Sequence, residues 1–180
     1  LAAKAMQAGR QINAKKNAGT SLGLFDKLRY RLYNKLIYTK VKSAIGLGRV
    51  RICISGAAPI SAEILEFMSG LDVVIHEVYG QSEDSGPTSF NQPGATRFGS
   101  VGPVFPGVEV KLAEDDEILV RGKNVFLGYY KDEDATNSTL VDGWLHSGDL
   151  GKFDDEGYLT IIGRKKEIII TAGGKNIPPQ

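Results

Sequence analysis

Two runs rich in hydrophobic residues each end in a glycine-containing loop that carries small or polar side chains. Arg49–Ser55 (RVRICIS) leads into Gly56–Pro59, and Asp72–Tyr79 (DVVIHEVY) leads into Gly80, followed by polar residues. Runs of this length and composition predict buried parallel strands. In such sheets, ligands bind beyond the carboxyl ends of the strands. The two loops are therefore candidate ligand-binding segments.

Several common chemical motifs are absent from the sequence. It contains neither the GxxxxGK[ST] phosphate loop nor GxGxxG. With one cysteine and two histidines, a structural zinc site is close to excluded, and His76-Glu77 lacks the second histidine of a zinc protease. The acidic segment Asp154–Gly157 resembles part of a calcium loop, but Lys152 occupies the first ligand position. A hairpin turn explains this segment better.

The composition is that of a soluble globular protein. The chain has 180 residues, of which 42% are hydrophobic and 24% charged. No apolar run approaches the roughly 18 residues that would predict a membrane-spanning helix. A single cysteine, Cys53, excludes an internal disulfide framework and favours a reducing, cytoplasmic location. The sequence begins at Leu1 without a signal-peptide pattern, so we expect a piece of a longer protein.

Positive charge is concentrated at the start of the chain. Residues 1–51 carry 12 Lys or Arg and one acid, whereas residues 52–180 carry 10 Lys or Arg and 20 acids. A helix is expected from about 22 to 45, with cations on one face and an apolar stripe on the other. The stripe comprises Phe25, Leu28, Leu32 and Leu36. A core helix with a solvated cationic face is the favoured interpretation, and peripheral attachment to a membrane surface is the alternative. No motif or aromatic context supports binding of nucleic acid.

The order of the expected elements predicts an α/β fold. Ser61 is placed to cap a helix that ends near Gly70, between the two buried strands, which gives a βαβ unit. From about Gly99 the pattern changes to hairpins, with Val108–Leu112 and Glu117–Arg121 alternating at the strand period of two. We therefore expect a twisted, mostly parallel sheet with helices over residues 1–98, and a small β-rich, barrel-like subdomain over residues 99–163.

Five phrases in the second half of the chain resemble one known family. In order, they are Ser55–Pro59 (SGAAP), Tyr79–Glu83 (YGQSE), Asp142–Asp149 (DGWLHSGD), Gly163–Glu167 (GRKKE) and Thr171–Pro179 (TAGGKNIPP). Together they resemble the adenylate-forming, AMP-binding superfamily. Within it they are similar to the long-chain fatty acyl-CoA synthetases, and the last phrase most resembles the bubblegum-type branch. The resemblance covers roughly residues 50–180.

The resemblance implies a ligase that activates a carboxylate in two steps. A fatty acid would attack the α-phosphorus of ATP, giving an acyl-adenylate and pyrophosphate. The thiol of coenzyme A would then displace AMP. Mg²⁺ would offset charge on the phosphates, and positioning would carry much of the rate. The small-molecule partners implied are ATP, coenzyme A and a fatty acid.

The resemblance also implies roles for individual residues. Those implied to contact ATP or AMP are Gly56, Ala57, Ala58, Pro59, Glu77, Tyr79, Gly80, Ser82, Asp149 and Arg164. Among them, the glycine and alanines would form the wall against adenine, Tyr79 would lie on the adenine face, and Asp149 would accept hydrogen bonds from the ribose hydroxyls. A core aromatic at a strand end is the alternative for Tyr79. Glu83 would bind magnesium; an ordinary solvated acid is its alternative.

Further implied roles lie towards the end of the chain. Lys166 would be the hinge of a C-terminal lid domain that begins within residues 164–180, and Gly173 and Gly174 would line the coenzyme A tunnel. Gly86 would border the acyl channel. The family's phosphate loop and its C-terminal catalytic lysine are not in this sequence, so no catalytic residue is assigned and we expect these 180 residues alone to be inactive.

Two other functions remain open from the sequence. One is a related adenylating enzyme for another carboxylic acid, such as an aryl or amino acid, because much of the acyl pocket lies outside these residues. The other is a noncatalytic module that binds a nucleotide or docks on a membrane through its basic helix.

Overall fold

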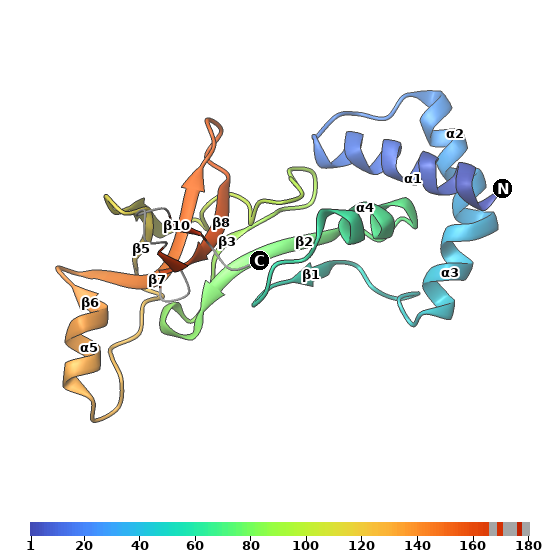
Figure 1. Cartoon of the computed structure of the whole chain (residues 1–180). Coiled ribbons are helices and arrows are strands. Elements are labelled where there is room, and N and C mark those ends of the chain that lie inside the picture. Colours follow the sequence, from blue (N-terminus) through green and yellow to red (C-terminus); the bar gives the residue numbers. More distant parts are fainter. Residues whose placement is uncertain (166–168, 171–175, 178–180) are drawn as a thin grey trace. The chain divides into compact units, whose positions relative to one another are not determined.

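The computed structural model describes the backbone of residues 1–165, 169–170 and 176–177, and the side chains of residues 1–165. Figure 1 shows the order of the helices and strands along the chain. They form two compact units, Leu1–Glu77 with Asn91–Gly99, and Val78–Phe90 with the residues from Ser100 onward. Helices and strands are mixed, so the α/β class expected from the sequence is confirmed.

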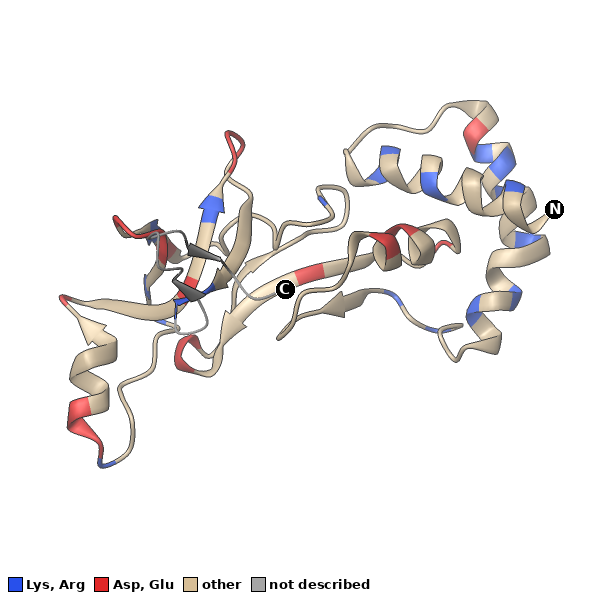
Figure 2. Ribbon diagram, in the orientation of Figure 1, with Lys and Arg blue, Asp and Glu red and all other residues tan. Residues whose placement is uncertain are grey.

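The first unit opens with α1 (Ala2–Asn17), α2 (Leu24–Tyr33), η1 (Asn34–Tyr38) and α3 (Thr39–Ala44). The last three follow one another without a break and fill the helix expected between about 22 and 45, with η1 as a π-helical turn. No sequence pattern had pointed to α1. Lys and Arg are spread along these helices (Figure 2). No helix among the described residues has both the length and the apolar character needed to cross a membrane.

The apolar stripe of the second helical segment faces outward. Its members are Phe25, Leu28, Leu32 and Leu36. Each is between 41% and 71% exposed, so the expectation that this stripe is buried as part of a core helix is wrong for the described chain. The reason is that tyrosines and charged residues, rather than leucines, form the inner face of the helix.

That inner face makes polar contacts within the first unit. The Tyr38 side chain is fully buried, and its hydroxyl donates to the Ala5 carbonyl at 2.5 Å. Asp72 accepts hydrogen bonds from the Tyr30 hydroxyl at 2.9 Å and from Lys42 Nζ at 2.6 Å. Burial, reinforced by Asp72, raises the pKa of Tyr30, so its hydroxyl stays protonated and donates. The helix is therefore anchored by hydrogen bonds that periodicity alone does not predict.

The expected parallel strand pair is present, but the expectation that its first run, at residues 49–55, is buried is wrong for the described chain. Val50, Ile52 and Ile54 are each between 42% and 54% exposed, because no described element covers them. β1 (Cys53–Ser55) and β2 (Ile75–Gln81) pair in parallel, with α4 (Ala62–Gly70) between them in the chain. Ser61 caps α4 as expected, its hydroxyl accepting from the Ile64 backbone N–H at 3.4 Å. Each strand begins three or four residues later than the hydrophobic run that predicted it, at Cys53 rather than Arg49 and at Ile75 rather than Asp72.

α1 packs closely against α4 because glycine lies at the contact. A Cβ on Gly9 would be 2.4 Å from the Gly70 carbonyl oxygen, well inside van der Waals contact. Beside it, the Asn13 side chain donates to the Ser69 carbonyl at 2.9 Å. The buried amide of Asn13 thus finds a partner at the end of α4, where backbone carbonyls lack partners within the helix.

In the second unit, the last residues of β2 pair antiparallel with β3 (Gly86–Phe90) across the short turn η2 (Ser82–Asp84). The register shifts between Tyr79 and Gly80. A Cβ on Gly80 would lie 1.7 Å from the Gly86 carbonyl oxygen, so only glycine fits there. Sequence patterning did not predict β3, whose run GPTSF lacks alternation.

The rest of the second unit is an open, antiparallel sheet. Its strands are β4 (Val108–Leu112), β5 (Glu117–Gly122), β6 (Leu140–Val141), β7 (Trp144–Phe153) and β8 (Leu159–Arg164). They run in the order β4-β5-β7-β6, with β8 also paired to β7, and among the described residues the sheet does not close into a barrel. The hairpin expected from alternation is confirmed, because Val110 pairs with Val120 and Leu112 with Ile118. The helix α5 (Glu133–Thr139) precedes β6, and a short pair, β9 (Ile169–Ile170) and β10 (Asn176–Ile177), follows β8.

The core of the second unit is formed by buried side chains of β2, β5, β7 and β8. Its buried members are Tyr79, Ile118, Val120, Leu145 and Leu159. The residues of β5 that point inward are those that the alternating pattern predicted. The hydroxyl of Tyr79, a member of this core, has its hydrogen-bond partner on β7.

Candidate functional site

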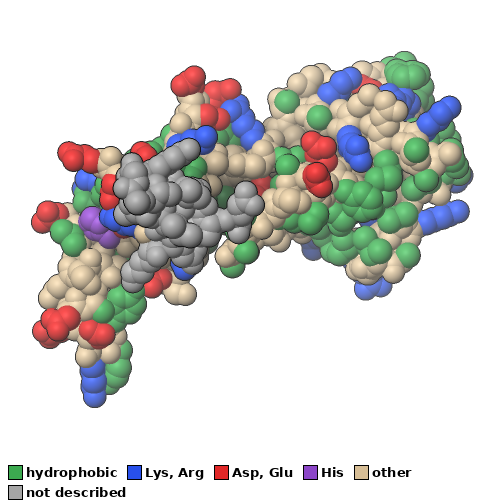
Figure 3. Space-filling view, viewed as in Figure 1, with side chains coloured by type: hydrophobic (Ala, Val, Ile, Leu, Met, Phe, Trp, Pro, Cys, Tyr) green, Lys and Arg blue, Asp and Glu red, His purple; other side chains and the backbone are tan. Residues whose placement is uncertain are grey.

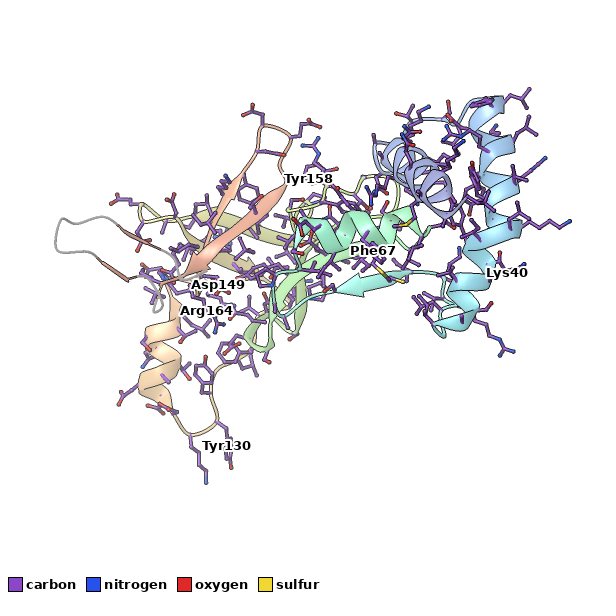
Figure 4. The ribbon with its side chains drawn as sticks, turned by 45° about the vertical axis from the view of Figure 1, so that its right-hand side comes forward. Lys40, Phe67, Tyr130, Asp149, Tyr158 and Arg164 are labelled. Atoms are coloured by element: carbon purple, nitrogen blue, oxygen red, sulfur yellow. The ribbon has the colours of Figure 1, made fainter. Side chains whose placement is uncertain are left out.

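A buried carboxylate on β7, that of Asp149, lies between a tyrosine and an arginine. The Tyr79 hydroxyl donates to Oδ2 at 2.9 Å, and Arg164 Nε donates to Oδ1 at 2.9 Å. Asp149 is 7% exposed, whereas the Arg164 side chain is 61% exposed. Asp149 and Arg164 are also strand partners on β7 and β8, and Figure 4 shows them together. The structure thus brings together three residues that the sequence resemblance named.

Tyr79 is itself part of the core of the second unit. Burial raises its pKa, and the neighbouring Asp149 carboxylate adds to this, so the hydroxyl remains a donor at neutral pH. Its ring packs among aliphatic side chains. This is the placement expected for a core aromatic at a strand end, the alternative considered from the sequence. A stacking contact between Tyr79 and adenine stays a prediction.

The turn η2 carries two neighbouring acids in different environments. The Glu83 carboxylate accepts from the Tyr129 hydroxyl at 2.7 Å and is partly exposed. Asp84 is buried and accepts from the Gln81 backbone N–H at 2.9 Å and from the Thr88 hydroxyl. Burial raises the pKa of Asp84, although these hydrogen bonds oppose the shift. Asp84 therefore holds the turn that presents Glu83, a role that the sequence did not reveal.

Ser82, the first residue of η2, is exposed next to Glu83. Its hydroxyl and the Glu83 carboxylate are consecutive in the chain on one short turn. Gly80, just before the turn, is fixed by its close approach to the Gly86 carbonyl. Gly86 has a φ of 125°, a backbone conformation that suits glycine, so the turn itself explains this residue. Its role in an acyl channel stays a prediction.

In the first unit, the loop between β1 and α4 contains Gly56–Pro59. All four residues are exposed, and Ala57 adopts a positive φ of 66°, which is uncommon for a residue with a Cβ. Strained backbone of this kind clusters at functional loops. The small side chains leave the backbone of this loop open to a ligand, and its contact with adenine remains a prediction.

Glu77, also in the first unit, forms hydrogen bonds with the segment at residues 91–99. Its Oε2 accepts from the Gly99 N–H at 3.1 Å, and its carbonyl accepts from the Asn91 N–H at 3.0 Å. Burial raises the pKa of Glu77, and the Gly99 hydrogen bond partly offsets this. The structure thus gives Glu77 a role in holding residues 91–99. Its predicted contact with the adenine amino group is a separate prediction.

Three of the residues named from the resemblance lie outside the described residues. They are Lys166, expected at the hinge, and Gly173 and Gly174, expected in the coenzyme A loop. The preceding residue, Lys165, is described: its Nζ lies 2.6 Å from Asp115 Oδ2 and 3.0 Å from Glu117 Oε2.

Glu117, at the start of β5, is a buried acid that the sequence did not identify as part of the site. It is 5% exposed, and its carboxylate accepts from Lys165 Nζ, from the Gly148 N–H at 2.9 Å and, at 3.2 Å, from His146 Nδ1. Its partners are up to 48 residues away in the chain. Only its position at the start of a strand, after an acidic turn, is visible in the sequence, and that carries no signal of burial.

Glu117 makes the stability of the fold depend on pH in the acid range. Burial alone raises its pKa, but the hydrogen bonds from Lys165, Gly148 and His146 outweigh burial and hold the pKa below its usual value of 4.5. A carboxyl whose folded-state pKa is lowered stabilises the fold above its unfolded-state pKa, and this stability is lost as the pH falls through the folded-state value. Glu117→Gln should therefore flatten the decline in thermal midpoint as the pH falls below 4.5. Glu114→Gln, at an exposed position on the same turn, is the control; parallel declines in wild type and Glu117→Gln would contradict the assignment.

Comparisons with known proteins agree with these features. The chain is 45% identical over 185 residues to the long-chain-fatty-acid–CoA ligase ACSBG2 of Xenopus laevis, covering 99% of this chain and 25% of that protein. It is 45% identical to the long-chain-fatty-acid–CoA ligase FadD15 of Mycobacterium bovis, over 87% of this chain and 26% of that protein. The chain thus spans about a quarter of the length of these curated relatives.

A similar solved structure carries the same fold. The O-succinylbenzoate coenzyme A synthetase of Bacillus subtilis, in complex with ATP and magnesium ion, matches with a TM-score of 0.65 and 26% identity, over 88% of this chain and 38% of that one. The family model described as "AMP-binding enzyme" matches residues 7–130, more than half of the chain and including the loop after β1 and the turn η2. The chain therefore belongs to the AMP-binding enzyme family.

Proposed function

We propose that this chain is the central part of a long-chain fatty acid–CoA ligase, which activates a fatty acid with ATP and transfers the acyl group to coenzyme A. The observation that carries the proposal is the buried Asp149 carboxylate, held between Tyr79 and Arg164 on a protein of the AMP-binding family. The names of the two relatives, both long-chain-fatty-acid–CoA ligases, support the choice of substrate.

Exposed apolar side chains support the proposal that more protein surrounds this chain. Figure 3 shows hydrophobic side chains gathered on a face of the first unit. The exposed large hydrophobic residues on or beside β1 and α4 include Val50, Ile52, Ile54, Ile64 and Phe67. Exposed apolar side chains gathered in this way favour an interface, because soluble proteins rarely leave large apolar patches in water. In the proposed full-length enzyme, the three quarters of the protein that lie outside these 180 residues would cover this apolar surface.

In the proposed reaction, Asp149 binds the ribose of ATP. An ionised carboxylate has about four acceptor positions. Tyr79 and Arg164 occupy two of them, which leaves acceptors for two ribose hydroxyls. Arg164, with most of its side chain exposed, is then placed beside the nucleotide, where its charge would attract phosphate. The ribose would thus be fixed by charge-assisted hydrogen bonds.

The remaining proposed contacts divide between adenine and phosphate. We propose that the backbone of Gly56–Pro59 lies against adenine, with Glu77 and Tyr79 near the base, and that Ser82 donates to the α-phosphate. Glu83 fits the proposed magnesium ligand, because Mg²⁺ prefers one or two carboxylate oxygens together with substrate phosphates. Such an ion would supply charge neutralisation at the phosphates. The hydrogen bond from Tyr129 fixes one Glu83 oxygen and so orients the carboxylate.

The chemistry proceeds in two displacements. A carboxylate oxygen of the fatty acid bonds to the α-phosphorus while the bond to the β-phosphate oxygen breaks, giving acyl-AMP and pyrophosphate. The coenzyme A thiol, having lost its proton, then attacks the acyl carbon, and AMP leaves with the electron pair of the broken bond. The groups of this chain bind and orient the adenosine in both steps, which is a positioning role.

The substrate class is tested by giving the full-length protein a panel of acids. We expect palmitate to form a coenzyme A thioester with release of AMP, and benzoate and phenylalanine to form none above background. Preferential use of benzoate or phenylalanine would instead indicate the related adenylating enzyme considered from the sequence. Absence of AMP release with every acid, by folded protein, would favour a noncatalytic module and contradict the proposal.

We also propose a peripheral membrane contact, which the exposed face of α2 favours. Leu24, Phe25 and Leu28 are each more than half exposed there, and Lys27 and Arg31 are exposed on the same segment. Apolar side chains beside cations suit an anionic bilayer surface, where each Lys or Arg contributes about 1 kcal/mol.

The membrane contact is tested by sedimentation of the full-length protein with phosphatidylserine-containing vesicles. The variant carrying both Phe25→Ser and Leu28→Ser should lose about 100-fold in binding, because each side chain contributes roughly 1.5–3 kcal/mol when fully buried and 1.4 kcal/mol corresponds to a factor of ten. Leu127→Ser, at an exposed leucine of the second unit, is the matched control and should bind like wild type. Equal sedimentation of all three proteins would contradict the contact.

A further inference from the structure

The segment that carries Asp149 leaves the regular ladder between β5 and β7. Leu119 pairs with His146, but Glu117 pairs with Leu150, and the register shifts between them. Three residues of β7, 147–149, therefore face the single residue Ile118 of β5. Bulges of this kind bend a strand and re-aim a side chain, and they are common next to active sites. Here the bulge carries the carboxylate that meets Tyr79 and Arg164.

A bulge leaves backbone groups without ladder partners, and side chains supply them here. The Ser147 hydroxyl accepts from the Asp149 N–H at 3.1 Å. The Gly148 N–H donates to Oε1 of Glu117 at 2.9 Å. Glu117 reaches from the opposite strand, so its carboxylate spans the gap that the extra residues open. Backbone groups in such a place require a partner, because an unpaired buried N–H is costly.

The second oxygen of Glu117 is fixed from the other side. Oε2 accepts from Lys165 Nζ at 3.0 Å and lies 3.2 Å from His146 Nδ1, which donates because an ionised carboxylate only accepts. Lys165 is held in turn by Asp115 at 2.6 Å. A buried carboxylate that accepts from a cation and from two further donors is held in one orientation. Turning it would break hydrogen bonds that cannot be replaced by bonds to water in a buried place.

We propose that Glu117 is a positioning residue for nucleotide binding, holding the bulge at residues 147–149 so that the Asp149 carboxylate faces Tyr79, Arg164 and the ribose. The inference rests on the proposed role of Asp149 in binding ATP and adds a residue that does not itself touch the nucleotide. Glu117 acts through Gly148: when its carboxylate is removed, the bulge can relax into the ladder and Asp149 turns from its partners.

The test is steady-state kinetics of the full-length enzyme with ATP, palmitate and coenzyme A. We expect Glu117→Ala to raise the KM for ATP roughly tenfold or more, since displacement of a binding group by about 1 Å is costly. The KM for coenzyme A should change less than twofold. Glu117→Gln keeps a neutral acceptor for Gly148, so it should recover most of the lost ATP affinity. Glu114→Ala, on the exposed turn before β5, is the control and should match wild type.

A double-mutant cycle separates positioning from general stability. If Glu117 acts through Asp149, Glu117→Ala made in the Asp149→Ala background should raise the KM for ATP less than twofold further. The same fold-increase in both backgrounds would overturn the inference, as would equal rises in the KM for ATP and for coenzyme A. If Glu117→Ala does not fold, the cycle is run with Glu117→Gln: the smaller rise in the KM for ATP that it causes should disappear in the Asp149→Ala background, and a rise of the same size in both backgrounds overturns the inference.

The cycle also distinguishes this inference from the proposed function. If Asp149→Ala alone leaves the KM for ATP unchanged, the proposed ribose contact is wrong and the inference falls with it. If Asp149→Ala impairs ATP use but Glu117 changes are additive with it, the proposed function stands and only the positioning role of Glu117 is overturned.

Discussion

Asp149→Ala in the full-length protein should raise the KM for ATP by roughly 100-fold or more. The substitution removes two charge-assisted hydrogen bonds to the ribose, each worth about 1.5–3 kcal/mol, and 1.4 kcal/mol corresponds to a factor of ten. It also leaves the Tyr79 hydroxyl and the Arg164 guanidinium without the carboxylate that they bond. The measurement is the dependence of AMP release on ATP concentration at saturating palmitate and coenzyme A.

Two further variants define what the Asp149 result means. Asp155→Ala removes a carboxylate from the exposed turn between β7 and β8 and should leave the KM for ATP unchanged. Asp149→Asn keeps the shape but loses the charge, so its KM should lie between those of wild type and Asp149→Ala. A KM for ATP in Asp149→Ala within twofold of wild type would contradict the ribose assignment.

Gly80→Ala is expected to be the most destabilising small substitution near the site. The added Cβ would lie 1.7 Å from the Gly86 carbonyl oxygen and 3.0 Å from the Pro87 Cα, both in the backbone of β3. Because Gln81 pairs with Gly86, one strand must move to relieve the clash. Overpacking of this severity costs about 3 kcal/mol, and one of the two clashing strands, β2, carries Tyr79. The measurement is the thermal midpoint of the full-length protein.

Gly23→Ala is the matched control for Gly80→Ala. Gly23 precedes α2 with a φ of −67°, and a Cβ there meets no atom within 4 Å. Its thermal midpoint should fall far less than that of Gly80→Ala, because glycine and alanine differ at a helix N-cap by only about 1 kcal/mol. Similar midpoints for the two variants would show that the close approach of Gly80 to β3 does not constrain the native fold.

The sequence could predict those elements whose hydrophobic pattern matches their burial. The β4–β5 hairpin is such a case, because alternating Val110, Leu112, Ile118 and Val120 face one core and pair across the strands as expected. The parallel pairing of β1 with β2 was predicted from two hydrophobic runs with a capped helix between them, although the first of these runs is exposed in the described chain. In both cases short-range sequence and tertiary packing favour the same structure.

The helix from 24 to 44 shows why periodicity is insufficient. Its leucine stripe has the spacing of a buried face, yet it is exposed in the described chain. The face that packs inward is held by Tyr30, Tyr38 and Lys42, through hydrogen bonds to α1 and to Asp72. These contacts join residues 30 or more positions apart, and a periodic pattern within one helix contains no information about them.

Some residues of the candidate site could likewise be predicted from the sequence, and others could not. Asp149, Tyr79 and Arg164 were named because each belongs to a short phrase that resembles the family, and the structure joins them. Asp84 and Glu117 were not named, because an acid on a turn or at a strand start is normally solvated. Their burial depends on a tight turn and on a bulge, and both arise from pairing between distant strands.

The central claim is that this chain holds the adenosine of an acyl-adenylate through Asp149. The most direct measurement is calorimetric titration of the full-length protein with a nonhydrolysable palmitoyl-adenylate analogue in magnesium buffer, compared among wild type, Asp149→Ala and Asp155→Ala. We expect wild type and Asp155→Ala to bind the analogue at one site with equal affinity, and Asp149→Ala to bind at least about 100-fold more weakly. Equal binding by Asp149→Ala, or no binding by folded wild-type protein, would contradict the claim.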